Sequence, residues 1–263
     1  MKDNLNARIH ARDDNIPARD DNISARVDLI NEKIEAACLR CGRMRREIGL
    51  MAVTKFHTLE AVEAAWQAGI RLFGENRVQE ATEKYTGFDG THPRGKSFVG
   101  SSADDGFELH FIGSLQRNKA KTAAAFFDCI QSVDRDSLID TLGALTIGRE
   151  SPLMILLEYH TGEETKAGFP SRDSLFRAAD RVLSFPGLRP AGLMTMAPFT
   201  QDKAVVRSAF RELASARDEL AKRFPGEHWS CLSMGMTGDF EIAIEEGSTM
   251  IRIGTAIFGE REA

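Results

Sequence analysis

The sequence has no apolar run long enough to cross a membrane, because its densest run, Leu153–Leu157, has only the length of a β-strand. Its four cysteines are too few for a disulfide framework. No apolar segment follows the charged stretch from Met1 to Asn15, so no secretory leader is visible. The 34 Lys and Arg residues do not outnumber the 39 Asp and Glu residues, which excludes the strongly basic footprint of a nucleic-acid-binding protein. We therefore expect a soluble cytoplasmic protein that binds neither membranes nor nucleic acid.

Short motifs of several enzyme classes are also missing. The chain contains no G-x-S-x-G elbow, no Walker loop and no G-x-G-x-x-G sequence. Cys38 and Cys41 form one C-x-x-C pair without a second pair at zinc-finger spacing, and both lie on the apolar stripe of a predicted helix. We interpret them as core cysteines and expect no metal site.

A short repeat occupies the start of the chain. The segment Ala11–Ile16 recurs as Ala18–Ile23, and a weaker copy follows over Ala25–Ile30. Pro17 interrupts any continuous helix, and the Asp-Asp-Asn triplets offer little apolar surface to bury. We predict that residues 1–22 are a poorly ordered extension and that residues 23–263 form one folded domain.

Apolar runs and amphipathic helical stretches alternate from Ser24 onward, a pattern typical of a parallel sheet. The predicted strands are Gly49–Val53, Ile70–Phe73, Leu109–Ile112, Cys129–Val133, Leu153–Tyr159, Leu188–Met194, Trp229–Met234 and Met250–Ile253. Closure into a single (β/α)8 barrel suits a chain of 263 residues and leaves no exposed sheet edge. An open doubly wound sheet is the alternative.

One connection breaks this alternation. Residues 86–107 are rich in Gly, Ser, Asp and His and show little periodicity. We interpret this segment as a long surface loop, which is either a lid or a plain insertion.

A lysine closes the first predicted strand. In a parallel barrel, functional groups gather where strands end and loops begin. Lys55 follows the apolar run Gly49–Val53 at such a position. Desolvation lowers the pKa of an amine and makes it a nucleophile, as Schiff-base chemistry requires. A lysine that only extends its ammonium to the rim fits the pattern equally well, so both interpretations stay open.

Two loops near the end of the chain have the composition of a phosphate site. Ser233–Asp239 and the segment from Arg252 to Thr255 each place Gly and hydroxyl residues after a predicted strand. Barrel enzymes often bind phosphate with the loops after strands seven and eight. Strand alternation turns Arg252 inward, where a carboxylate or a ligand must satisfy it. A rim lysine, a phosphate site and an inward arginine together fit pyridoxal phosphate.

Two further polar residues admit two interpretations each. Asn76 follows the second predicted strand, as either a ligand contact or the cap of the next helix. His110 lies inside an apolar run, where a hydrogen-bonded core histidine is the preferred interpretation over a ligand.

Several blocks of the chain resemble the pyridoxal phosphate homeostasis protein family, in order over roughly residues 24–259. They are Ala52–Lys55, Phe73–Glu80, His110–Lys119, Gly192–Ala197, Leu232–Asp239 and Ile251–Gly259. The resemblance implies a fold-type-III barrel, like the amino-terminal domain of alanine racemase, that carries pyridoxal phosphate as an internal aldimine. The cofactor-binding residues that it implies are Lys55, Asn76, Met194, Ser233, Gly235, Arg252, Gly254 and Thr255.

Individual roles also follow from the resemblance. Lys55 matches the Schiff-base lysine, and Arg252 lies where the pyridine nitrogen is approached. The phosphate-binding positions match Ser233, Gly254 and Thr255. The chain departs from the family pattern after Lys55, where many relatives have a second lysine nearby, and at the end of strand five, where Glu158–Thr161 replaces the usual Val-Asn.

The resemblance implies a protein that carries and buffers the cofactor, serving vitamin B6 and amino-acid balance with little turnover. Racemisation needs a second acid/base opposite the lysine. The chain ends at Ala263, just after the last predicted strand, so we expect no carboxy-terminal β-domain to supply that group, and the only tyrosines are Tyr85 and Tyr159. An arginine at the ring nitrogen also weakens the cofactor as an electron sink.

Our leading hypothesis is thus a pyridoxal phosphate-binding protein, monomeric or weakly dimeric, that passes the cofactor to apo enzymes or free amino acids. The alternative is a slow amino-acid racemase that uses the same Schiff base. A third hypothesis is a barrel enzyme acting on a phosphorylated sugar, with the lysine bonded to the substrate.

Overall fold

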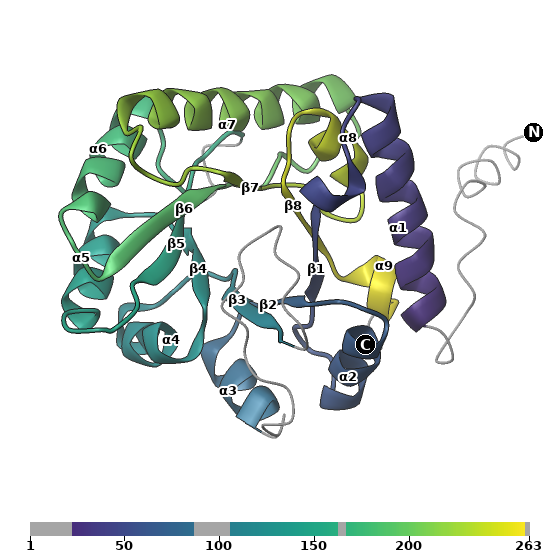
Figure 1. Ribbon diagram of the computed structural model, residues 1–263, viewed down its shortest axis with the longest axis horizontal. Helices are drawn as coiled ribbons and strands as arrows, with labels where there is room; N and C mark the ends of the chain where they lie inside the picture. The colour runs from purple at the N-terminus through teal and green to yellow at the C-terminus, as the bar shows by residue number, and fades with distance from the viewer. Residues whose placement is uncertain (1–22, 87–105, 163–166, 261–263) are drawn as a thin grey trace, which may run out of the picture.

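The computed structural model describes residues 23–86, 106–162 and 167–260. Within these residues, eight parallel strands close into a barrel in chain order, with β1 beside β8 (Figure 1). The strands are β1 Gly49–Val53, β2 Leu72–Glu75, β3 Glu108–Phe111, β4 Cys129–Val133, β5 Leu153–Glu158, β6 Leu188–Met194, β7 Cys231–Ser233 and β8 Met250–Ile253. The predicted (β/α)8 barrel is confirmed, and the open sheet is excluded.

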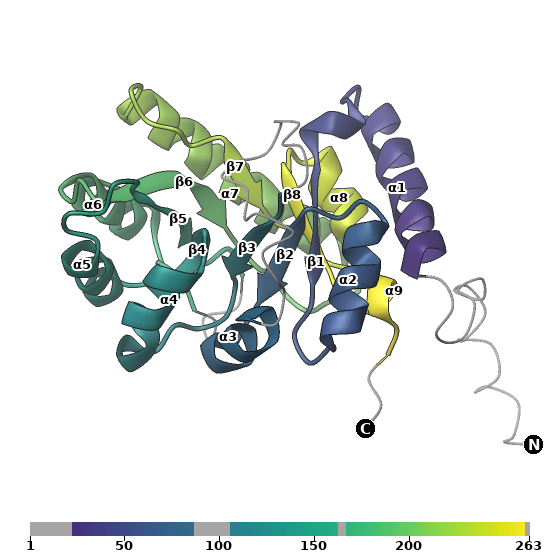
Figure 2. The same ribbon diagram turned by 60° about the horizontal axis from the view of Figure 1, so that its bottom comes forward.

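The helices lie outside the strands, as Figures 1 and 2 show. They are α1 Ile23–Arg40, α2 Leu59–Gln67, α3 Val78–Thr86, α4 Ala120–Phe126, α5 Asp136–Leu145, α6 Arg172–Leu183, α7 Lys203–Arg223, α8 Phe240–Glu245 and α9 Thr255–Phe258, with short 3₁₀ turns η1 at Arg45–Glu47 and η2 at Arg117–Lys119. α1 precedes the barrel and packs against α2, α8 and α9. Across the described ranges, none of these helices has both the length and the apolar character that a bilayer span requires.

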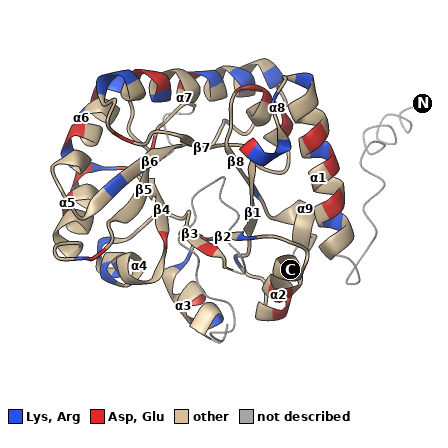
Figure 3. Cartoon of the chain, viewed as in Figure 1, with Lys and Arg blue, Asp and Glu red and all other residues tan. Residues whose placement is uncertain are grey.

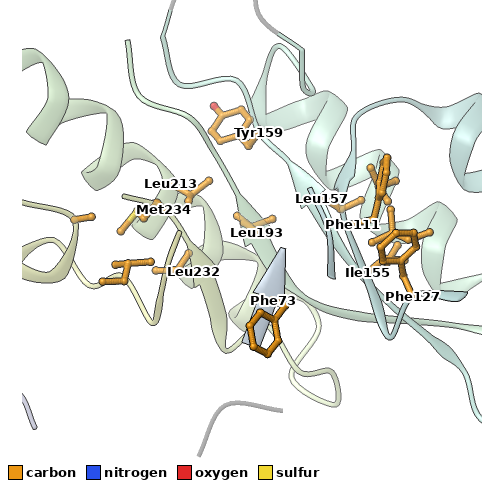
Figure 4. Packing of buried hydrophobic residues seen from close by; sticks show 14 of the residues in the cluster. Phe73, Phe111, Phe127, Ile155, Leu157, Tyr159, Leu193, Leu213, Leu232 and Met234 are labelled. Carbon is orange, nitrogen blue, oxygen red and sulfur yellow. The ribbon is translucent and has the colours of Figure 1, made fainter. Parts of the chain in front are cut away.

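Strand alternation separates two apolar layers. Outward-facing side chains such as Leu157, Leu193 and Leu232 pack against the helices in the larger cluster, part of which Figure 4 shows. Inward-facing side chains fill the barrel interior as a second cluster, which consists of Met51, Cys129, Leu156, Ala191, Met194, Cys231 and Met250. Polar side chains on the inward face therefore lie in a packed interior and must find partners there.

Four predicted strands have the observed bounds, β3 and β5 differ by one residue, and β2 and β7 each begin two residues later than predicted. β2 begins at Leu72, two residues after the predicted start at Ile70. Ile70 is buried, but it lies in the turn after α2, where its N–H donates to Ala65 O at 3.0 Å. In the sequence, a buried apolar residue of a turn cannot be distinguished from the first residue of a strand. The predicted amino-terminal extension (1–22) and most of the predicted loop (87–105) lie outside the described residues.

The predicted amphipathic first helix is confirmed, except that Cys41, expected on its apolar stripe as a core residue, lies in the turn after α1 and is only partly buried. Val27, Ile30, Ile34 and Cys38 are buried along one face of α1. Figure 3 colours charged residues of both signs along α1, α7 and α8. Arg40 of α1 pairs with Glu241 and Glu245 of α8 at 2.7 and 2.9 Å. Exposed pairs of this kind contribute little. The apolar stripe therefore carries the docking of α1.

Candidate functional site

The structure brings most of the predicted rim residues to one side of the barrel mouth. Lys55 follows β1, Asn76 follows β2, and Gly254 and Thr255 follow β8. The ladder pairs β8 with β1 and β1 with β2, so these loops are neighbours at the carboxyl ends of their strands. A Cβ added to Gly254 would lie 3.5 Å from Val53, the last residue of β1. The sequence-predicted lysine and the predicted phosphate loop therefore lie next to each other.

Lys55 is half-buried, and the peptide groups around it are held from α3. Lys84 Nζ donates to the Thr54 carbonyl at 2.7 Å, and the Phe56 N–H donates to a Glu80 carboxylate oxygen. Phe56 adopts a φ of 66°, in the left-handed region that residues other than glycine rarely occupy. The main chain on both sides of the lysine is thus fixed, and a strained turn follows it.

The charges that hold this turn form a buried ion-pair network between β1, β2 and α3. Lys84 Nζ lies 2.8 Å from Glu75 Oε1 and 3.2 Å from Glu80 Oε1. The Thr54 hydroxyl donates to Glu75 Oε1 at 2.7 Å and also contacts the Tyr85 hydroxyl at 2.8 Å. Burial raises the pKa of Glu75, and the hydrogen bond from Lys84 opposes that rise. The network therefore holds the two peptide groups on either side of Lys55.

Asn76 presents a buried acceptor that this part of the chain leaves unused. Its Oδ1 is buried and has no hydrogen-bond partner among the described residues. The helix-cap interpretation is therefore wrong for this oxygen. A Cβ on Gly113 would lie 2.2 Å from the Asn76 carbonyl oxygen, so glycine is required there for the β2 and β3 loops to meet. Asn76, Gln116 and Lys119 line one cleft at this junction.

Arg252 points into the barrel, as strand alternation predicts. Its side chain is 5% exposed and shares the inward face of β8 with Met250. One terminal nitrogen donates to Ser233 O and Ser233 Oγ, both at 2.7 Å, and the other donates to Thr195 O at 2.8 Å. Burial lowers the pKa of Arg252. The sequence left a carboxylate or a ligand as the expected partner, whereas these bonds go to neutral carbonyl and hydroxyl groups.

Ser233 and Met194 lie deeper than the rim. The Ser233 hydroxyl is fully buried and donates to Gln131 Oε1 at 2.6 Å while it accepts from Arg252. Met194 is 1% exposed and belongs to the interior cluster. Their predicted contacts with a cofactor remain predictions, and the structure adds that the Ser233 hydroxyl already joins two interior side chains.

The loops after β7 and β8 reach the rim itself. Gly235 has a φ of 97°, and an added Cβ would lie 2.6 Å from Ala243. The Met236 N–H donates to Asp239 Oδ1 at 2.6 Å, which removes one amide of the β7 loop from ligand binding. Thr255 is exposed at the start of α9, and His57 stacks on Phe258 of that helix with ring centroids 4.5 Å apart. The Lys55 turn and α9 are therefore packed together.

The sequence interpretation missed several residues that shape this site. Lys84 and Gln131 carried no signal, because a helix lysine and a strand glutamine are ordinary on a surface. Glu158 did carry one, since it ends an apolar strand as Lys55 does. Its carboxyl is 4% exposed, and burial and Asp134 raise its pKa to about 7 while Arg252 opposes the rise.

Comparison with known proteins identifies the family. The model described as "Alanine racemase, N-terminal domain" matches residues 33–262. The pyridoxal phosphate homeostasis protein of Vibrio cholerae is 39% identical over 88% of this chain and 92% of its own. The chain belongs to this family.

Solved structures of relatives agree in fold. A protein from Bifidobacterium adolescentis, described as unknown, superposes with a TM-score of 0.82 at 34% identity over 92% of this chain and 98% of its own. PipY of Synechococcus elongatus with pyridoxal phosphate bound gives a TM-score of 0.73 at 30% identity over 90% of this chain and all of its own. Membership therefore rests on both sequence and structure.

The residues at the mouth fit the group that the PipY structure names. Pyridoxal phosphate presents an aldehyde, a phosphate and a ring with polar edges. The mouth offers a primary amine at Lys55, the unpartnered buried oxygen of Asn76, a buried guanidinium at Arg252 and backbone amides of the Gly254–Thr255 loop. Each part of the group has a chemically matched residue on adjacent strands.

Proposed function

We propose that this protein binds pyridoxal 5'-phosphate covalently on Lys55 and serves pyridoxal phosphate, vitamin B6 and amino-acid homeostasis, with little or no turnover. The observation that carries the proposal is the position of Lys55, a half-buried amine beside the Gly254–Thr255 loop, with both flanking peptides held by α3. The relatives with the corresponding name, and PipY with the cofactor bound, support it.

The chain's own residues have distinct roles in this proposal. When bound, the cofactor supplies an aldehyde that condenses with a primary amine and releases one water. Lys55 provides that amine, and Ser233, Gly254 and Thr255 bind the phosphate, with Gly235 in the same pair of loops. Arg252 faces the ring nitrogen, Asn76 binds a polar group of the cofactor, and Met194 lies beneath it.

The positions of the two tyrosines favour a carrier over a racemase. The Tyr85 hydroxyl is bonded to Thr54 in the layer between strands and helices, and the Tyr159 hydroxyl donates to Glu212 of α7 at 2.9 Å. Burial and the bond to Glu212 raise the pKa of Tyr159 to about 12. Neither tyrosine is placed to exchange a proton over the barrel mouth, so the second base of a racemase is not supplied by these groups.

The proposed recipients are apo forms of pyridoxal phosphate-dependent enzymes and free amino acids. A primary amine of either kind can displace Lys55 from the Schiff base, which releases the cofactor without any change in oxidation state. We propose a monomer or a weak dimer as the working form.

The test is the visible spectrum of the purified protein. The wild-type protein should absorb as a Schiff base, and borohydride reduction followed by peptide mass spectrometry should locate the reduced adduct on Lys55. Lys55→Ala should abolish both signals, while the exposed control Lys222→Ala should retain them. An adduct on another lysine, or a protein that takes up no pyridoxal phosphate, overturns the proposal.

A second measurement separates the carrier from the slow racemase. Solvent deuterium is followed into the Cα position of several amino acids incubated with the loaded protein. We expect no incorporation above that with free pyridoxal phosphate. Exchange at enzyme-like rates, of the order of 1 per second or faster, would instead establish the racemase.

A further inference from the structure

Five buried polar side chains form a continuous hydrogen-bonded chain across the barrel interior. They come from strands on opposite sides of the ring: Glu108 and His110 of β3, Gln131 of β4, Ser233 of β7 and Arg252 of β8. All are 5% exposed or less. Because each lies on the inward face of its strand, the chain fills part of the interior that is otherwise apolar.

The contacts of the chain are short. Arg252 donates to Ser233 Oγ at 2.7 Å, and Ser233 Oγ lies 2.6 Å from Gln131 Oε1. Gln131 Nε2 lies 2.8 Å from His110 Nδ1, and His110 Nε2 lies 2.9 Å from Glu108 Oε2. We call these five residues the interior chain.

The donors and acceptors fix its direction. A guanidinium has no acceptor, so Ser233 must accept from Arg252 and give its single proton to Gln131 Oε1. The Gln131 amide nitrogen then donates to His110 Nδ1, which leaves the ring proton on Nε2 to donate to Glu108. These assignments place the ring proton of His110 on Nε2, and Gln131 Nε2 also contacts Met250 Sδ at 3.1 Å.

A positive charge and a negative charge lie at the two ends of the interior chain. A cation or carboxylate buried alone is costly, and aligned neutral dipoles between the two lower that cost because each polarises the next. Glu108 is connected to Arg252 only through the bonds of the interior chain. The groups that act on Arg252 directly are Asp239 of the β7–α8 loop, Glu158 of β5 and Cys231 of β7.

We propose that Gln131 and His110 are positioning residues that orient Arg252 and moderate its charge toward the ring of the bound cofactor. This inference rests on the proposed function, because Arg252 is where the ring nitrogen is expected. Neither residue needs to touch the cofactor. Their effect passes through Ser233 and Arg252, the only members of the interior chain among the expected cofactor contacts.

The direction of the interior chain is tested first, in the cofactor-free protein. Nitrogen-15 NMR of the imidazole, assigned by the loss of its signals in His110→Gln, should show the ring proton on Nε2. A ring with the proton on Nδ1, or on both nitrogens, overturns the interior chain whatever the cofactor does.

The effect on the cofactor is tested with two substitutions at one position. In His110→Gln, the amide oxygen can accept from Gln131 and its nitrogen can donate to Glu108, so the direction of the interior chain is preserved. His110→Leu breaks it. The exposed control is His228→Leu.

The readout is the pH midpoint of the visible absorbance of the loaded protein. His110→Leu should move this midpoint by about 1 unit to lower pH, because a less compensated guanidinium disfavours a protonated cofactor. His110→Gln and His228→Leu should keep the wild-type midpoint. Equal midpoints for His110→Leu and wild type refute the positioning role, as does an equal shift in His110→Gln.

The two failures can be told apart. A wild-type protein that takes up no pyridoxal phosphate overturns the proposed function and the link to the cofactor together, while the NMR result still decides the direction of the interior chain. If His110→Leu does not fold, Gln131→Leu takes its place, with a shift in the same direction, because Ser233 then loses its acceptor and the interior chain is broken one bond nearer to Arg252.

Discussion

The two sides of the barrel mouth hold their key cations in opposite ways. On the β1–β2 side, Lys55 is fixed through the peptides next to it, by charged side chains of α3 in the layer outside the strands. On the β7–β8 side, Arg252 is fixed by its own guanidinium, through neutral carbonyl and hydroxyl groups inside the barrel. On the first side the main chain next to the lysine is held from outside the strands, and on the second side the arginine side chain is held from inside the barrel.

The largest expected effect comes from removing the ion pair that supports the β1–β2 side. Lys84→Met leaves the fully buried Glu75 without its ion-pair partner, and removing one partner of a buried pair costs about 3 kcal/mol or more. Chemical denaturation should report this loss of unfolding free energy. The control Lys222→Met changes an exposed lysine of α7 and should be near neutral.

A restoring variant sharpens the same prediction. Adding Glu75→Gln to Lys84→Met removes the stranded charge, so the double variant should regain part of the lost stability. If Lys84→Met is as stable as the control, α3 does not hold the Lys55 turn in the way described.

The next effect concerns the charge balance around Arg252. Burial raises the pKa of Glu158 from 4.5 to about 7, so its carboxyl resists ionisation in the folded state. A raised carboxyl pKa destabilises the fold as pH rises from the unfolded to the folded value, here from 4.5 to about 7. Glu158→Gln should abolish this loss, making the variant more stable than wild type above pH 7 by up to about 3 kcal/mol and equal near pH 4.

The measurement is the unfolding free energy of both proteins at several pH values between about 4 and 8. Glu227→Gln, at an exposed glutamate of the α7–β7 turn, should leave the wild-type curve unchanged. If the unfolding free energies of Glu158→Gln and wild type change in parallel with pH, the Glu158 carboxyl ionises normally. Glu158 would then not be a carboxyl with a raised pKa near Arg252.

The smallest effect lies at the rim of the β7–β8 side. Thr255→Ala removes one hydroxyl that the proposed function assigns to the phosphate, which should raise the dissociation constant for pyridoxal phosphate by about tenfold. The Schiff-base absorbance at saturation should persist, because Lys55 is untouched. Dialysis followed by absorbance measures the retention, with Thr141→Ala on α5 as the control. Unchanged retention means that the phosphate lies elsewhere.

The local part of this site could be predicted from residue types and their spacing. Lys55 and Gly254 were expected at the ends of adjacent strands. The alternation of side chains along β8 predicted that Arg252 points into the barrel. His110 was expected as a hydrogen-bonded core residue, and the structure places it in the interior chain. The α3 network could not be predicted, since nothing in the spacing of Lys84 and Glu75 tells that both point between the strands and the helix.

Sequence alone determined the alternation of strands and helices and the inward face of Arg252, because hydrophobic periodicity is a local property of the chain. The tertiary structure decided that the sheet closes into a barrel and which inward-facing residues meet. Gln131 of β4 and Ser233 of β7 are 102 positions apart, and they touch only because eight strands close into one ring. Contacts across a closed interior depend on closure and register, and no short stretch of sequence contains either.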